Sequence, residues 1–110
     1  MTGQFDLLAL LDDSPQGKFE RFHRDNPDVY GVLVRLAREW RSRFGSRRLG
    51  MQMLFERARW EIAMATNDPE FRLNNNHAAF YSRLIMRQEH DLADAFETRR
   101  SAADDWAGAA

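Results

Sequence analysis

One segment of the sequence, residues 75–83, carries side chains suited to reading DNA bases. Asparagine can form two hydrogen bonds with adenine and arginine can form two with guanine, so both residue types are common in the major groove. A helix over residues 76–88 would present such side chains on its outer face, where the small Ala79 allows close approach. The base-reading candidates are Asn75, Asn76, Ser82 and Arg83.

An arginine-rich stretch, residues 35–48, is the matching candidate for phosphate contacts. It holds six arginines and one acidic residue, Glu39, in a chain whose formal net charge is −1. Guanidinium groups bind phosphate and carboxylate in the same forked geometry. Two arrangements therefore stay open: an exposed positive band, or internal pairing with carboxylates from the acidic later half of the chain. The phosphate candidates are Arg35, Arg38, Arg41, Arg47 and Arg48.

A second apolar stripe, on the helix expected over residues 51–65, is the candidate for binding protein. Met53, Trp60 and Met64 lie on a different side from the inner face of that helix. A helix that is apolar on two sides is either sandwiched between neighbours or shows one side to a partner. In a bundle this small we expect sandwiching. The alternative makes the three residues anchors for a host protein or for a second copy of the chain.

Catalytic and metal chemistry find no support in the pattern of residues. The chain has no cysteine, and His23, His77 and His90 do not take the spacing of metal ligands. Its six glycines are scattered and form no loop that could cradle a phosphate. We expect a protein that is not an enzyme and that holds no metal and no cofactor.

The 110 residues, 44% of them hydrophobic, suffice for one domain and not for two. The longest aliphatic run, residues 7–11, is far shorter than the ~18 residues of a membrane helix. The first residues lack the basic lead-in of a secretory signal. We expect a single cytoplasmic domain over residues 1–110 that does not contact a membrane.

Capping residues and apolar spacing predict an all-α domain of about five helices. Ser14-Pro15 and Asn26-Pro27 each place a capping side chain before a proline suited to a first helical turn. The clearest helix has an apolar stripe from Val29 to Phe44 and a natural stop at Gly45. Helical signals cover 4–12, a stretch that begins at Pro15, 27–44, 51–65, 76–88 and 91–103.

The connections complete this prediction. Residues 70–73 are expected to be extended or loop, any of the three asparagines at 74–76 can cap the next helix, and residues 104–110 form a frayed tail apart from Trp106. About ten residues separate the helices over 51–65 and 76–88. Because a simple helix-turn-helix has a tighter turn, a DNA-binding form of this domain would be an elaborated helix-turn-helix.

Several phrases in residues 19–104 resemble a family of short uncharacterised proteins from actinobacteria and their phages. The phrases are NPDVYGVLVRLARE, ERARWEIA, FRLNNN, FYSRLIM and FETRRSA. The resemblance implies a phage or prophage origin and a small helical fold, for which DNA binding is a common guess. It carries over no catalytic residue.

The sequence supports two functional hypotheses. The first is a small DNA-binding regulatory module of phage or prophage type, which reads bases with the helix over 76–88 and contacts phosphates of double-stranded DNA with the stretch over 35–48. The second is a non-enzymatic protein-binding effector, which inhibits a host protein or forms a homo-oligomer through the Met53, Trp60 and Met64 stripe.

Overall fold

The fold is all-α, as the sequence predicts. The computed structural model describes residues 13–106, which form four α-helices and three short 3-10 turns. The α-helices are α2 (Pro15–Asp25), α3 (Pro27–Phe44), α4 (Met51–Thr66) and α5 (Ala78–Gln88), and the turns are η1 (Asn75–His77), η2 (His90–Leu92) and η3 (Ala102–Asp105). The helix expected over 4–12 lies outside the described residues. None of the described helices is long and apolar enough to cross a membrane.

The helix boundaries agree in part with the local signals. Ser14 Oγ accepts a hydrogen bond from the Gly17 N–H (3.0 Å), as expected for the residue before Pro15. Asn26 departs from the prediction, because its side chain does not cap α3 and instead donates to the Phe22 carbonyl at the end of α2 (3.0 Å). Gly45 ends α3 at φ 62° and ψ −129°, a conformation that side chains disfavour.

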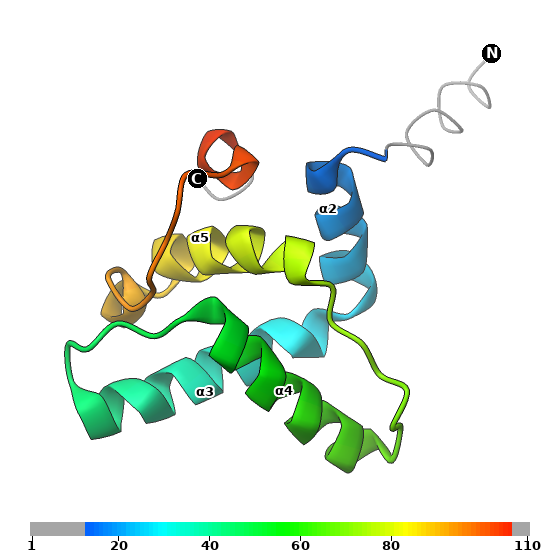
Figure 1. The fold of residues 1–110 in the computed structure, drawn as a ribbon, viewed down its shortest axis with the longest axis horizontal. Coiled ribbons are helices and arrows are strands. Elements are labelled where there is room, and N and C mark those ends of the chain that lie inside the picture. Colours follow the sequence, from blue (N-terminus) through cyan, green and yellow to red (C-terminus); the bar gives the residue numbers. More distant parts are fainter. Residues whose placement is uncertain (1–12, 107–110) are drawn as a thin grey trace.

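Helix α5 runs through the middle of the molecule and the other elements pack around it (Figure 1). α2 lies at one end of α5. α3 and α4 lie along one side of α5 and cross each other at an angle. Six consecutive residues of α5, 80–85, are buried. α5 is therefore the core helix, and over these residues it has no face left for solvent.

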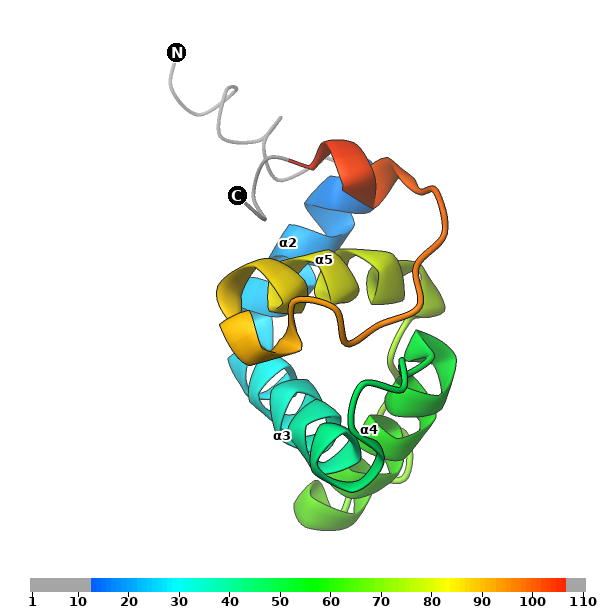
Figure 2. The ribbon, with the colours of Figure 1, turned by 90° about the vertical axis from the view of Figure 1, so that its left-hand side faces the viewer.

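The prediction of a helix over 91–103 is wrong. After the short turn η2 the chain continues as a strap without regular helix, residues 93–101, drawn in orange in Figure 2. The Leu49 N–H donates to the Ala95 carbonyl (2.8 Å), and the Glu97 N–H donates to the Leu49 carbonyl (3.1 Å). Two backbone groups of the strap thus pair with the segment before α4 rather than within a helix. Leu92, Phe96 and Ala103 are buried, as predicted, in a different backbone conformation.

The connection between α4 and α5 agrees with the prediction, and the end of the chain agrees with it only in part. Residues 70–73 form an irregular connection, as expected, and of the three asparagines Asn74 caps η1 by accepting from the Asn76 N–H (2.9 Å). The frayed tail predicted over 104–110 is wrong for Asp104 and Asp105, which belong to η3, whereas the exception made for Trp106 is confirmed, and residues 107–110 lie outside the described residues. The Trp106 side chain is buried and its Nε1–H donates to Glu20 Oε1 (2.9 Å), which ties the end of the described chain to α2.

An aromatic cluster centred on Phe19 joins α2 to α5 and to Trp106. The ring of Phe19 lies 4.7 Å from that of Tyr81, 5.1 Å from that of Trp106 and 5.3 Å from that of Phe80, between centroids. His23 and His77 contact the same ring at the edge of the cluster. Within the described residues, the Nδ1 atoms of both histidines and the Tyr81 hydroxyl are buried without a hydrogen-bond partner.

We expect the protein to lose stability as the pH falls below about 6.5. Burial lowers the pKa of His23 and of His77 from 6.5, so below that pH the unfolded chain binds protons that the folded chain does not. Urea unfolding at pH 7.5, 6.5 and 5.5 measures this loss. The His77→Gln variant removes one titrating group, and its stability should change less with pH than that of the exposed-residue control His90→Gln. An equal pH dependence in both variants would contradict the assignment.

Candidate functional site

The predicted base-reading face is not formed in this structure. The Ser82 side chain is fully buried, where its hydroxyl donates to the Ala79 carbonyl (2.8 Å), and Arg83 is only 9% exposed. The expectation that both lie on the outer face of the helix over 76–88 is therefore wrong. The physical reason is that the strap passes beside α5 (Figure 2), where its residues 97–101 line the same hollow as Ser82 and Arg83 and the Arg99 carbonyl accepts from Arg83.

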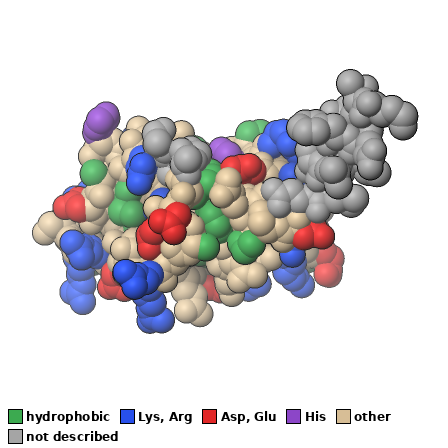
Figure 3. Space-filling view, turned by 90° about the horizontal axis from the view of Figure 1, so that it is seen from above, with side chains coloured by type: hydrophobic (Ala, Val, Ile, Leu, Met, Phe, Trp, Pro, Cys, Tyr) green, Lys and Arg blue, Asp and Glu red, His purple; other side chains and the backbone are tan. Residues whose placement is uncertain are grey.

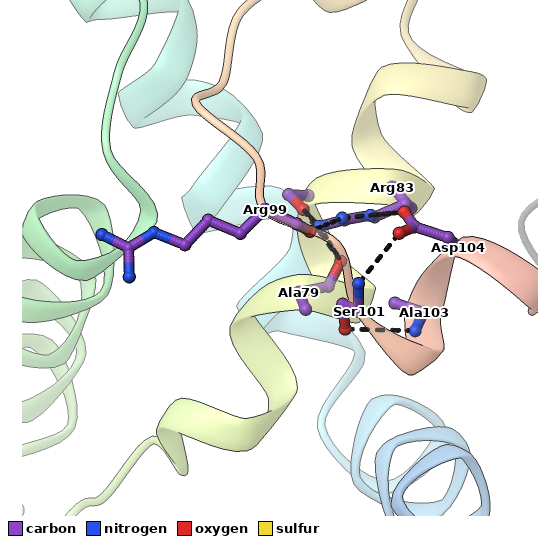
Figure 4. Close-up of polar contacts among 7 residues, drawn as sticks. Ala79, Arg83, Arg99, Ser101, Ala103 and Asp104 are labelled. Atoms are coloured by element: carbon purple, nitrogen blue, oxygen red, sulfur yellow. Dashed lines mark hydrogen bonds and ion pairs between the residues drawn. The ribbon is translucent and has the colours of Figure 1, made fainter.

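Arg83 instead fastens the end of the strap to α5 (Figure 4). Its Nε and Nη2 atoms lie 2.9 and 2.8 Å from Asp104 Oδ1, and Nη2 also donates to the Arg99 carbonyl (2.6 Å). The Asp104 carboxylate accepts from the Ser101 N–H (2.9 Å), and this bond together with Arg83 lowers the pKa of Asp104. Arg83 therefore has a structural role that uses most of its donors.

The two asparagines predicted to read bases are exposed. Asn75 and Asn76 form η1, just before α5 begins. Asn75 lines a hollow between the start of α4, α5 and the strap, to which Arg99 and Arg100 contribute basic groups and Glu97 an acidic one. Asn75 thus lies near groups of both signs, while the other two base-reading candidates, Ser82 and Arg83, are buried.

Three arginines of the 35–48 stretch are paired with carboxylates. Arg35 Nη2 lies 2.9 Å from Glu61 Oε2 of α4, and Arg41 Nη2 lies 2.6 Å from Asp94 Oδ1. Arg38 binds two carboxylates, with Nη2 at 2.7 Å from Glu89 Oε1 and Nε at 2.9 Å from Asp91 Oδ2. The pKa values of Glu61, Asp91 and Asp94 are lowered by these contacts. Of the two arrangements that the sequence left open, internal pairing is the one found for Arg35, Arg38 and Arg41.

The remaining arginines of the stretch lie where α3 ends. Arg43, Arg47 and Arg48 are exposed and form no ion pair within the described residues, although Arg48 is close enough to Asp94 to contribute to its lowered pKa. Figure 3 shows basic and acidic side chains interspersed on the face seen from above. The unpaired positive charge of this stretch is therefore a local patch at the α3–α4 turn.

The second apolar stripe is exposed, so the expectation that it is sandwiched between helices is wrong. Met53 is 51% exposed, Trp60 63% and Met64 70%. Phe44, which the sequence pattern assigns to the inner face of α3, is 50% exposed because α3 continues past the core by its last turn. These four side chains are the large hydrophobic ones that the described residues leave exposed.

A groove between α3 and α4 connects two of these side chains. It has a volume of about 580 Å³ and a floor formed by Leu36, Leu49 and Leu54. Trp40 and Phe44 line it from α3, and Met53 and Arg57 line it from α4. The Trp40 indole N–H donates to the Arg47 carbonyl (2.8 Å), which holds the turn against this wall. We call the groove and the four exposed side chains (Phe44, Met53, Trp60 and Met64) the α3–α4 surface.

The sequence pattern singles out three of the four exposed side chains and misses the groove. Phe44 lies on the last turn of α3, where the neighbouring helix no longer covers it. That position is the sequence signal for its exposure. Residues 13–106 hold no group of three or more histidines and carboxylates placed to bind a metal ion.

Comparison with protein-family models, with curated proteins and with solved structures finds no match to this chain. The resemblance to short phage and actinobacterial proteins therefore stays a prediction from the sequence.

Proposed function

We propose that this protein is a protein-interaction module and that its α3–α4 surface docks an amphipathic helix of another polypeptide. The observation that carries the proposal is the exposure of four large apolar side chains on α3 and α4, two of which, Phe44 and Met53, line a groove with an apolar floor. Leaving apolar surface in water costs about 25 cal/mol per Å². A helix with one apolar face would reduce that cost by lying along α4 beside the groove.

The exposed area is of the size that a stable interface needs. With about 200 Å² for a fully exposed large side chain, the four exposed fractions correspond to about 470 Å² of apolar surface. One side of a standard interface covers roughly 800 Å², of which about 56–65% is apolar. The α3–α4 surface thus supplies the apolar part of one side of such an interface.

The groove is lined by one acidic residue, Glu39, as well as by arginines, and the arginines at its α3–α4 turn favour carboxylates near one end of the partner helix. Arg43 lines the groove, and Arg47 lies at the turn that closes its end. Both lack a carboxylate partner within the described residues. Carboxylates on the docked helix would complete these ion pairs, which chiefly improves the association rate and the orientation of the partner.

A labelled peptide tests this proposal with the purified chain. The probe is an 18-residue peptide with leucines at helical three- and four-residue spacing and glutamates between them. We expect fluorescence anisotropy to report a Kd of about 10–100 μM, because the interface is of minimal standard size. The Trp60→Glu variant should weaken binding at least tenfold, since it removes the largest apolar group and adds a repelling charge.

Two controls make the result specific. A peptide of identical composition with its leucines scrambled around the helix should not bind, and Arg87→Glu, which adds an acidic charge on the exposed end of α5, should bind as the natural chain does. Equal binding of both peptides, or binding unchanged by Trp60→Glu, would overturn the proposal.

The DNA-binding hypothesis stays a prediction from the sequence. Of its nine candidate residues, two are buried in α5 and three are paired with carboxylates. No second observation on the described residues favours it, so we do not propose it.

A further inference from the structure

We infer that the docked helix is α4 of a second copy of this chain, and that two copies pair through α4 in antiparallel orientation. This inference rests on the proposed function, because it names the partner of the α3–α4 surface. It goes beyond that proposal by fixing the register and the residues that meet.

The outward face of α4 has the spacing of a coiled-coil seam. Met53, Arg57, Trp60 and Met64 succeed one another at intervals of four, three and four residues, as the a and d positions of a heptad do. All four are exposed. The seam extends over about 17 Å of helix at 1.5 Å per residue, which is enough for four contact layers with a second helix.

In an antiparallel arrangement the four seam residues of one copy face the four seam residues of the other, and each facing pair is favourable. A two-fold axis between Ala58 and Arg59 places Met53 opposite Met64 of the second copy, and Trp60 opposite Arg57 of the second copy. The Met pairs bury flexible apolar side chains against each other. The guanidinium of each Arg57 stacks on the indole of Trp60 of the other chain, a favourable cation–π contact that occurs twice by symmetry.

The charges beside the seam suit a copy of the same helix. Glu56 pairs with Arg59 (3.0 Å) and Arg57 pairs with Glu61 (3.0 Å), so α4 carries equal numbers of both signs along this side. A uniformly acidic or basic helix would repel its own copy. This helix does not, because its flanking charges already neutralise each other.

The same register completes the ion pairs that the single chain leaves open. Asp68 and Glu70 come just after the end of α4 and are exposed, and the Glu70 side chain is 85% accessible although its Oε2 lies 3.7 Å from Arg72 Nη2. In the antiparallel pair the end of α4 of the second copy lies over the start of α4 of the first, next to the turn that carries Arg43, Arg47 and Arg48. The acidic partner that this basic patch requires is therefore present in the chain itself.

Sedimentation velocity between about 1 μM and 1 mM protein tests the pairing. We expect a reversible monomer–dimer equilibrium with a Kd of about 1–100 μM. Trp60→Arg should raise that Kd at least about 30-fold, because it removes the indole and places two guanidinium groups opposite each other, whereas Arg87→Glu should leave it unchanged. Circular dichroism of each variant checks that the helices are intact. A natural chain that stays monomeric at 1 mM would overturn the inference.

Cysteine pairing tests the register, since the natural chain has no cysteine. We expect a mixture of Met53→Cys chains and Met64→Cys chains to form a disulfide-linked dimer on mild oxidation, and each variant alone to form at least fivefold less. Disulfide bonds require Cα atoms about 4.4–6.8 Å apart, which only opposed positions reach. Efficient linkage of Met53→Cys chains with one another would indicate parallel pairing and would overturn the register.

The peptide experiment separates the two proposals. If the natural chain is monomeric and still binds the acidic amphipathic peptide in a Trp60-dependent way, the docking function stands and the second copy is not the partner. If it is monomeric and does not bind the peptide, both proposals fall.

Discussion

The Phe19→Ala variant should lose about 3–5 kcal/mol of unfolding free energy. The Phe19 side chain is fully buried and its ring contacts those of His23, His77, Phe80, Tyr81 and Trp106. Truncation leaves a cavity where α2, α5 and the end of the described chain meet, and rigid rings on several sides cannot all move in to fill it. Small domains have an unfolding free energy of only about 5–15 kcal/mol, so this variant would lose much of its stability.

Urea unfolding monitored by circular dichroism measures this loss, and thermal unfolding should show the midpoint lowered by at least about 12 °C. Phe44→Ala is the matched control, since the same truncation at a half-exposed ring should cost less than about 1 kcal/mol. A loss below about 1 kcal/mol for Phe19→Ala would show that the aromatic cluster is not the stabilising centre of the fold.

Arg83→Ala should cost about 2–3 kcal/mol and release the strap from α5. The substitution removes the donors to Asp104 and to the Arg99 carbonyl from a site where the guanidinium is nearly buried. Hydrogen bonds that involve a charged group contribute more than neutral ones, and the acceptors left behind lose a partner. The effect is smaller than for a fully buried pair, because Asp104 remains about half accessible to water.

Amide hydrogen exchange resolves this prediction by location. Exchange should accelerate at Ala103 and Trp106, whose amides bond within the segment that Arg83 fastens, and should change less in α3. Arg87→Ala, one turn further along α5 and exposed, is the control and should leave both stability and exchange unchanged. Protection that stays the same in Arg83→Ala would mean that the strap is held by its apolar residues and not by this arginine.

Much of the helical framework could be predicted because its signals are local. Ser14 and Pro15, Pro27, and Gly45 mark helix ends through backbone chemistry that acts within a few residues. The core side of α3 and α5 also agrees with the spacing, since Leu33, Leu36, Phe80 and Leu84 are all buried. These features need no knowledge of which helix lies beside which.

The strap could not be predicted from local signals. The apolar residues Leu92, Phe96 and Ala103 are spaced as on a helix, yet the Leu49 backbone offers the strap hydrogen bonds from more than 40 residues away in sequence. Such long-range backbone pairing overrides a weak helical preference. The burial of Ser82 and Arg83 is a direct consequence of this strap, which is why the predicted base-reading face failed.

The sequence by itself determined that this protein is all-α, where its main helices begin and end, and that α4 is apolar on two sides, because each of these properties depends on residues within a few turns of one another. Only the tertiary structure decided which charges are neutralised and which apolar side is left open. Arg38 meets Glu89 and Asp91 across 51 and 53 residues, while Trp60 meets nothing that covers it within the described chain. Whether a side chain is paired or exposed depends on elements that come from elsewhere in the chain, and their positions are set by packing and not by spacing.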